Sequence, residues 1–367
     1  MSFSESNGNR ISHSGIRSTV KGHVESRFSS TTGQWTEPCF VTGSLLTLDG
    51  MSPGLNYGQQ IFEGLKARRN RKGGITIFRP KDHATRIKRS AELMAMPEVP
   101  EELFLTSVHL AVSGNSQHLS HHDANAALYI RPIEFASSAR LLIEPSDEFM
   151  FCVYVQQIIG PAIPSKGKAL ISDDFDRAAT RGVGAAKAGG NYAPAMRWTA
   201  KAKRQGYDFL LHLDSQSQSE IEEFSWSGFV GVRRDGDKVT VIHSSSNAII
   251  ASITVDSIVR LATSLGWRTE KRPIKYDELS TFTEVFAAGT AIGLTPISSI
   301  HRPSTNETYH FDADGLCYHK LQDSLLGIQK GKIEDAFGWC VQSEPDTTDQ
   351  LDHRAQEFGV RQEIGVK

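Results

Sequence analysis

The chain has 367 residues, of which 39% are hydrophobic and 22% charged, and its formal net charge at pH 7 is −2. Such a length favours two domains, and such a composition is typical of a globular protein with a sizeable core. The balanced charge, without a large basic block, argues against nucleic acid as a partner. No uncharged apolar run approaches the ~18 residues that a membrane span requires.

Residues 1–30 are rich in Ser, Thr and Gly, which predicts a disordered N-terminal arm. The arginines of this arm are compatible with a mitochondrial transit peptide, whereas Glu5 and Glu25 argue against one. A cytoplasmic location is therefore favoured, with a mitochondrial one as the alternative. The four cysteines are scattered along the chain, which favours reduced thiols.

Residues 31–159 are expected to form the smaller of two domains, of α/β type. Short runs of branched and aromatic residues predict strands, and Pro97 is expected to stop the first helix. The expected elements are short strands and turns over Trp35–Ala67, helices over Lys81–Met96 and Glu102–Ser113, and strands over Ala126–Phe135 and Glu148–Ile159.

Two prolines and two glycines among residues 160–167 predict an interdomain linker. Residues 168–342 then form the larger domain, and residues 343–367 a flexible tail. Pro194 suits the first turn of a helix that continues to Gln205. The other expected elements, in a mostly antiparallel α+β arrangement, are strands over Ala169–Ile171, Phe209–Leu213, Phe229–Val232 and Val239–Ile242, a helix over Thr254–Leu265 capped by Thr254, and a helix over Leu321–Gly331.

One lysine stands out because small residues flank it on both sides. The segment Arg181–Tyr192 reads Arg-Gly-Val-Gly-Ala-Ala-Lys-Ala-Gly-Gly-Asn-Tyr, with Lys187 near its middle. Another molecule can approach the backbone closely there, and a sheltered amine has the lowered pKa that Schiff-base chemistry needs. A solvated surface lysine is the simpler alternative. A phosphate P-loop does not fit, since Ala186 and Ala188 stand where that motif has Gly and Ser or Thr.

The segment from Lys187 to Pro194 resembles the cofactor-lysine segment of eukaryotic branched-chain aminotransferases, which are class IV, fold-type IV enzymes that use pyridoxal phosphate (PLP). The resemblance extends in order over Trp35–Cys340. It implies a two-domain α+β fold similar to D-amino acid aminotransferase, with a β-barrel-like core in the larger domain, and a homodimer with the active site near the subunit interface. Further matching segments are Tyr57–Ala67, Leu128–Pro132, Ala288–Ala291 and Gly327–Trp339.

The resemblance implies how PLP is held at its ring. Lys187 binds the cofactor as a Schiff base, and its freed amine then moves the proton between the α-carbon of the substrate and C4′ of the cofactor. Tyr192 donates a hydrogen bond to the phenolic oxygen of the cofactor. Glu223 keeps the pyridine nitrogen protonated, with Glu222, one residue away, as the alternative.

The cofactor phosphate needs hydrogen-bond donors. Arg86 resembles the arginine that the family uses for the phosphate, and Thr290 adds a hydroxyl. Ile253 and Thr254 open the clearest helix of the chain, whose first N–H groups and dipole favour an anion.

By the same resemblance, the backbone N–H of Ala291 binds the substrate carboxylate. Tyr57, Phe62, Tyr129 and Arg131 line the pocket for the substrate side chain, with some contribution from the partner subunit.

Two positions depart from the family pattern. Trp226 aligns with a small hydroxyl residue near the substrate carboxylate, and Gly228 aligns with an asparagine. An indole fills far more space than a threonine and lacks its compact hydroxyl. This change favours a specialised enzyme, one that serves a secondary-metabolite pathway and accepts an unusual branched or longer side chain. The two-cysteine redox pair of animal members is absent, since the matching stretch is Ala291–Pro296.

Three imidazoles and a carboxylate occur together in His118–Asp123. A zinc site is conceivable from these residue types, but a solvated helix end is the favoured interpretation, and no metal is expected.

The sequence therefore predicts reversible, PLP-dependent transfer of the amino group between a branched-chain L-amino acid and 2-oxoglutarate. The partners are small amino and 2-oxo acids and a second copy of the chain. The alternatives are another fold-type IV enzyme, namely a D-amino acid aminotransferase or an aminodeoxychorismate lyase, and a non-catalytic binding protein with the same fold.

Overall fold

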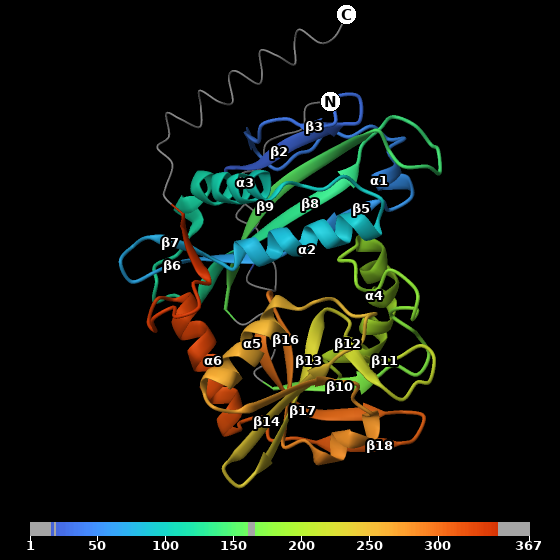
Figure 1. The fold of residues 1–367 in the computed structure, drawn as a ribbon, viewed down its shortest axis with the longest axis vertical. Coiled ribbons are helices and arrows are strands. Elements are labelled where there is room, and N and C mark those ends of the chain that lie inside the picture. The colour runs from blue at the N-terminus through green and yellow to red at the C-terminus, as the bar shows by residue number, and fades with distance from the viewer. Residues whose placement is uncertain (1–15, 18–19, 161–165, 344–367) are drawn as a thin grey trace, which may run out of the picture.

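Two large sheets, one above the other in Figure 1, form the framework of the protein. The computed structural model describes residues 16–17, 20–160 and 166–343. The arm predicted for residues 1–30 falls outside these ranges at 1–15 and 18–19. The same holds for residues 161–165 of the predicted linker and residues 344–367 of the predicted tail.

The smaller domain is built on an antiparallel sheet with the strand order β19-β7-β6-β8-β9-β2-β3. Strands β8 and β9 pair along their whole length and form its centre. The strands of this sheet are β1 (Ile16–Arg17), β2 (Gly22–Ser29), β3 (Gln34–Trp35), β4 (Cys39–Thr42), β5 (Gln60–Phe62), β6 (Leu65–Arg69), β7 (Ile75–Phe78), β8 (Ala126–Ala136), β9 (Glu148–Ile159) and β19 (Cys340–Ser343).

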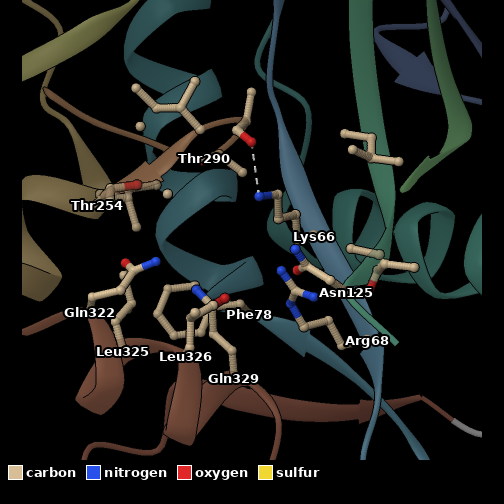
Figure 2. A pocket seen from close by; sticks show the side chains of 18 of the residues that line it. Lys66, Arg68, Phe78, Asn125, Thr254, Thr290, Gln322, Leu325, Leu326 and Gln329 are labelled. Carbon is tan, nitrogen blue, oxygen red and sulfur yellow. Dashed lines mark hydrogen bonds between the residues drawn. The ribbon is translucent and has the colours of Figure 1, made fainter. Parts of the chain in front are cut away.

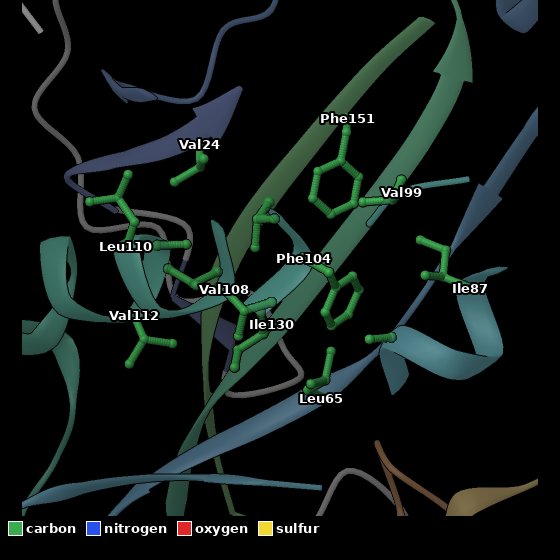
Figure 3. Close-up of a cluster of buried hydrophobic side chains, with 14 of the residues drawn as sticks. Val24, Leu65, Ile87, Val99, Phe104, Val108, Leu110, Val112, Ile130 and Phe151 are labelled. Carbon is green, nitrogen blue, oxygen red and sulfur yellow. The ribbon is translucent and has the colours of Figure 1, made fainter. Parts of the chain in front are cut away.

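Helices α2 (Pro80–Leu93) and α3 (Glu101–Gly114) cover one face of this sheet, and the short α1 (Pro53–Asn56) lies at its edge. Helix α3 presents a buried stripe at Phe104, Val108 and Ala111, the spacing of one helix face. Figure 3 shows how Phe104 meets Phe151 of β9 in the core between the helices and the sheet.

The larger domain contains a closed barrel. Strands β10, β11, β12, β13, β16 and β17 are hydrogen-bonded in a ring that the β12–β13 pairing completes. Most pairs are antiparallel, whereas β10 pairs in parallel with β11 and β17. The strands of this domain are β10 (Gly167–Ile171), β11 (Phe209–Leu213), β12 (Ile221–Phe224), β13 (Ser227–Asp235), β14 (Lys238–Ser244), β15 (Arg268–Arg272), β16 (Glu284–Gly289), β17 (Gly293–Arg302) and β18 (Glu307–His310).

Three helices pack on the outside of the barrel: α4 (Gly189–Arg204), α5 (Ile253–Ser264) and α6 (Leu316–Gln329). Helices α5 and α6 bury Ile258, Leu261, Leu321 and Leu325 against β13 and β16. The start of α5 contacts the smaller domain, since Arg79 Nη1, just before α2, donates to the Ile253 carbonyl at 3.2 Å.

The predicted α+β, two-domain fold with a barrel in the larger domain is confirmed, and β9 and β11 have the predicted bounds. Other boundaries were wrong. Residues 22–29, assigned to the loose arm, form the buried strand β2, because β9 supplies an edge that pairs with it. Residues 340–342, assigned to the larger domain, belong to β19, which returns to pair with β7 of the smaller sheet.

Three helix starts were also wrong. Helix α6 begins at Leu316 rather than at Leu321. Helix α4 begins at Gly189, so Pro194 lies inside it rather than in its first turn. Helix α5 begins at Ile253, and its cap is Ser252, whose Oγ accepts a hydrogen bond from the Val255 N–H at 3.2 Å, rather than Thr254. The error at α4 arose because Gly189, Gly190 and Asn191 are poor helix formers by propensity, and the error at α5 because two nearby residues, Ser252 and Thr254, can each act as a cap.

Candidate active site

A cavity of about 540 Å³ opens between the two domains. This is within the usual range for a small-molecule site. Twelve of the thirteen predicted site residues line it: Phe62, Arg86, Tyr129, Arg131, Lys187, Tyr192, Glu223, Trp226, Ile253, Thr254, Thr290 and Ala291. They come from both sheets and three helices, so only the tertiary fold brings them together.

Lys187 is fixed by the smaller domain although it precedes a helix of the larger one. Its N–H donates to Ser90 Oγ of α2 at 3.0 Å, and its carbonyl accepts from the Phe62 N–H of β5 at 2.9 Å. Burial, reinforced by the positive charge of Arg86, lowers the pKa of the Lys187 amine to about 7. A large fraction of this amine is therefore neutral, and nucleophilic, near pH 7.

The Lys187 side chain lies against two aromatic rings. Its Nζ donates to the hydroxyl of Tyr192 at 2.7 Å and lies 4.6 Å from the centroid of the Phe62 ring. The rings of Phe62 and Tyr192 meet edge to face at 5.0 Å. Burial raises the pKa of Tyr192, so this hydroxyl keeps its proton and can act as a hydrogen-bond donor.

A buried carboxylate lies on the barrel side of the cavity. Glu223 Oε1 accepts from the Ile250 N–H at 3.2 Å and pairs with Arg177 Nη2 at 2.6 Å. Burial raises the pKa of Glu223, and Arg177 opposes that rise. The neighbouring Glu222 points to the opposite face of β12, where Ser246 donates to it, and it does not line this cavity. The geometry thus favours Glu223 over Glu222.

Arg86 is held by a carboxylate that the sequence analysis did not single out. Its Nε and Nη2 each donate to Glu63 at 2.7 Å, and its Nη1 donates to the Ala251 carbonyl at 2.9 Å. His83 Nδ1 lies 2.6 Å from Glu63 Oε2. Burial by itself would raise the pKa of Glu63, but the charges and hydrogen bonds of Arg86 and His83 outweigh burial, so this pKa lies well below its usual range.

The first turn of α5 and the β16–β17 turn form the wall next to Arg86. Ile253 and Thr254 occupy the first two helical positions, whose N–H groups have no partner within a helix. Thr290 and Ala291 lie in the β16–β17 turn. Backbone donors, a hydroxyl and a guanidinium therefore converge on one end of the cavity, which suits a phosphate.

The opposite wall comes from strand β8. Arg131 Nε donates to the Glu63 carbonyl at 2.9 Å, its Nη2 donates to the Tyr129 hydroxyl at 3.2 Å, and its guanidinium lies 4.6 Å from the Phe62 ring centroid. A Cβ at Gly64 would lie 2.1 Å from the Tyr129 hydroxyl. Only glycine therefore allows Tyr129 to take this position.

The two departures from the family pattern have different structural contexts. Trp226 sits in the β12–β13 turn, is 39% exposed, lines the cavity and contacts the ring of Phe209. At Gly228 a Cβ would lie 2.5 Å from Val255 Cγ2. The space of the missing asparagine is thus taken by Val255, and glycine is required for β13 to approach α5.

Tyr57 was predicted to line the substrate pocket, and in the single chain it does not. Its ring is 48% exposed, and its hydroxyl donates to the Leu141 carbonyl at 3.2 Å. Tyr57 follows α1 at the outer edge of the smaller domain. Its predicted role includes a contribution from a partner subunit, so that role stays a prediction.

The histidine cluster noted in the sequence lies on the surface. Ligand atoms of His121, His122 and Asp123 come within 4.8 Å of one another, but His121 and Asp123 are exposed. His118 is not part of this group. The solvated cluster remains the favoured interpretation.

Sequence reasoning missed two charged residues that organise the site. Glu63 lies next to Phe62 in Tyr57–Ala67, one of the segments that resemble the family. Its position in that segment could have identified it as a site residue. Arg177 precedes Lys187 by ten residues in a stretch of turns, and nothing local marks it as the partner of Glu223.

A model of the amino-transferase class IV family matches residues 60–300. Aminotransferase TOXF of Cochliobolus carbonum is 48% identical over 327 residues, which cover 88% of this chain and 92% of that protein. Branched-chain amino acid aminotransferase gloG of Glarea lozoyensis is 47% identical over 331 residues, with 87% and 91% covered.

Among solved structures, the branched-chain amino acid aminotransferase of Thermobaculum terrenum in its PLP form superposes with a TM-score of 0.70 at 22% identity, covering 89% of this chain and 99% of that one. This likeness concerns the fold. Among the helices described here, none is long and apolar enough to cross a membrane.

Proposed function

Since the chain belongs to the class IV aminotransferase family, whose cofactor is PLP, we propose that it transfers the amino group reversibly between a branched-chain L-amino acid, or one with a related apolar side chain, and 2-oxoglutarate. The observation that carries the proposal is the placement of Lys187. Its buried amine, with a lowered pKa, faces a cavity that has phosphate donors at one end and an aromatic wall at the other.

The residues of the cavity fit PLP. Lys187 is the covalent attachment point, Tyr192 the donor to the phenolic oxygen, and Glu223 the acceptor at the pyridine nitrogen. At the phosphate end we assign Arg86, the first turn of α5 at Ile253 and Thr254, and the hydroxyl of Thr290. When bound, PLP supplies an electron sink that stabilises negative charge at the substrate α-carbon.

Catalysis then depends on how this chain holds and moves protons. With PLP bound, the Lys187 amine would take the proton from the substrate α-carbon as a general base and return it as a general acid. Its lowered pKa makes it a competent base near neutrality. The hydrogen bond that Lys187 Nζ donates to Tyr192 and the face of the Phe62 ring keep the amine on one face of the site, which restricts proton transfer to one stereochemical outcome.

Substrate selection is assigned to the walls away from the phosphate end. Phe62 and Tyr129 offer apolar surface to a branched side chain, and the Ala291 N–H is assigned to the substrate carboxylate. Among the described residues the Arg131 guanidinium donates to a carbonyl and a hydroxyl and has no carboxylate partner, so it suits the second carboxylate of 2-oxoglutarate or glutamate. Trp226 extends the apolar wall towards solvent, which favours side chains longer than that of valine.

We also propose a homodimer. Leu55 and Ile143 are exposed by 65% and 90%, and the Tyr57–Leu141 hydrogen bond joins the two segments that carry them. Clustered exposed apolar side chains of this kind mark an interaction surface. In a dimer, Tyr57 would lie where it can approach the site of the partner, as the family resemblance implies.

The test is a half-reaction. The purified protein loaded with PLP is mixed with L-leucine, L-valine, D-alanine or L-alanine without any keto acid, and the absorption band of the bound cofactor is followed. A change with L-leucine that 2-oxoglutarate reverses supports the proposal. A change with D-alanine alone would replace it with a D-amino acid aminotransferase, and no change with any amino acid would favour the lyase or the non-catalytic alternative.

A further inference from the structure

A second, smaller cavity shares Thr290 and Ala291 of the β16–β17 turn with the active-site cavity. It has a volume of about 160 Å³ and lies between strand β6 of the smaller domain and helix α6 of the larger one. Figure 2 shows Lys66 and Arg68 reaching into it from one side, and Gln322 and Gln329 from the other.

Two cations share this cavity. Lys66 and Arg68 are two residues apart on β6, so their side chains point to the same face of the sheet. Arg68 is only 8% exposed. Burial and the charge of Arg68 lower the pKa of Lys66 to about 7, and burial lowers the pKa of Arg68. The two groups thus repel each other in a poorly solvated space.

No acidic residue of the described chain lines the cavity to balance these charges. Lys66 Nζ donates to the Ala291 carbonyl at 3.0 Å, and Arg68 Nη1 donates to the Ala126 carbonyl at 2.9 Å. Within the described residues, Arg68 Nε is buried without a hydrogen-bond partner. Burying an unpaired charge is costly, and a counter-ion offsets that cost.

The other polar side chains of the lining include three carboxamides, those of Asn125, Gln322 and Gln329. The NH₂ group of a carboxamide can donate two hydrogen bonds to an oxyanion. A volume of about 160 Å³ holds a few waters or one small oxyanion, given roughly 30 Å³ for each water.

We propose that this cavity is a binding site for one small oxyanion, an inorganic phosphate or a carboxylate, held by Lys66 and Arg68 and by the carboxamides of α6. It is separate from the active-site cavity, which contains Lys187 and Glu223, although Ile253, Thr254, Thr290 and Ala291 form a wall of both. The bound anion joins the two domains at the turn that carries Ala291. This proposal does not depend on the amino acid that the enzyme prefers.

The experiment is calorimetric titration of the PLP-loaded protein with inorganic phosphate, in a low-salt zwitterionic buffer. Loading with PLP keeps the phosphate end of the active site filled. We expect one saturable site per chain, with affinity at least tenfold weaker in Arg68→Met and in Lys66→Met. Arg71→Met and Lys72→Met remove exposed charges from the same hairpin and should leave the affinity unchanged. A parallel titration with acetate identifies the anion, since stronger variant-sensitive binding of acetate means a carboxylate site.

Gln322→Leu is the second probe should the charge variants fail to fold, because it removes one carboxamide and no buried charge. It should weaken binding several-fold. Three results overturn the proposal: no saturable binding of phosphate or acetate, binding that Arg68→Met and Gln322→Leu leave intact, or binding that occurs only in the cofactor-free protein. The last result would place the anion at the phosphate end of the active site.

Discussion

Glu63 and Arg86 form a bidentate ion pair at the centre of the domain boundary, with two nitrogen–oxygen distances of 2.7 Å. The pair joins the β5–β6 connection to α2, and Arg86 reaches onward to the Ala251 carbonyl just before α5. Glu63 therefore does not contact the reacting atoms. It positions the guanidinium assigned to the cofactor phosphate.

Glu63→Gln should lower both stability and cofactor affinity. Removing the carboxylate leaves Arg86 buried without its counter-charge, and breaking such a pair costs about 3–5 kcal/mol. Urea unfolding of the cofactor-free protein measures the stability, and titration with PLP measures the affinity. Glu148→Gln, an exposed position on β9, is the control. An unchanged PLP affinity in Glu63→Gln would contradict the positioning role.

The contribution of Glu63 should also depend on pH. Its pKa in the folded protein lies below the ordinary value of 4.5, so the folded state binds fewer protons than the unfolded state in acid. The stabilisation is thus fully present above about pH 4.5 and is lost as the pH falls below it. The difference in unfolding free energy between wild type and Glu63→Gln should shrink from pH 6 to pH 3. A constant difference over that range would show that Glu63 has an ordinary pKa.

Lys187→Ala should abolish covalent PLP binding and lower kcat by at least about 10²–10⁴-fold, the usual contribution of a general acid–base group. In the wild-type protein without cofactor, the rate of PLP attachment should rise with pH and level off above about 7, because the amine that attacks is deprotonated there. Stopped-flow absorbance at a series of pH values measures it. A rate still rising tenfold per pH unit at pH 9 would mean an ordinary lysine. Lys72→Ala, an exposed lysine, is the control.

Gly228→Ala should destabilise the protein by about 1–3 kcal/mol, the range for overpacking in a core. The added Cβ would meet Val255 Cγ2 at 2.5 Å. Combining it with Val255→Ala should restore part of that loss, so the two changes are non-additive. Thermal unfolding of the two single variants and the double variant measures the coupling. Additive effects would mean that the contact with Val255 is not the reason why position 228 requires glycine.

Trp226→Thr should change substrate preference rather than stability. The indole lies in a turn and forms the outer wall of the cavity, so its loss removes apolar contact from long side chains and adds a small hydroxyl. The ratio of kcat/KM for L-2-aminooctanoate to that for L-valine should fall about tenfold, within the ~1–3 kcal/mol typical of a pocket contact. Trp226→Phe should retain most of the wild-type ratio. Equal effects on both substrates would exclude a role in specificity.

The sequence by itself determined the local elements and the chemistry-bearing positions. Runs such as Glu148–Ile159 and Phe209–Leu213 have their predicted bounds because their strand propensity and turn punctuation are local signals. The small residues around Lys187 and the resemblance of its segment predicted a cofactor site from the sequence. Twelve of the thirteen residues named in that prediction line one cavity.

Other features were decided only by tertiary structure. Strand β2 is fixed by pairing with β9, and β19 by pairing with β7. The paired strands are far apart in the sequence, so local propensity cannot predict these pairings. The partnerships of Glu63 with Arg86 and of Arg177 with Glu223 exist because desolvation makes an unpaired charge costly once the chain has folded. The sequence identifies Lys187 as the candidate residue. Only its burial in the folded protein lowers the pKa of its amine, because the charged form is poorly solvated there.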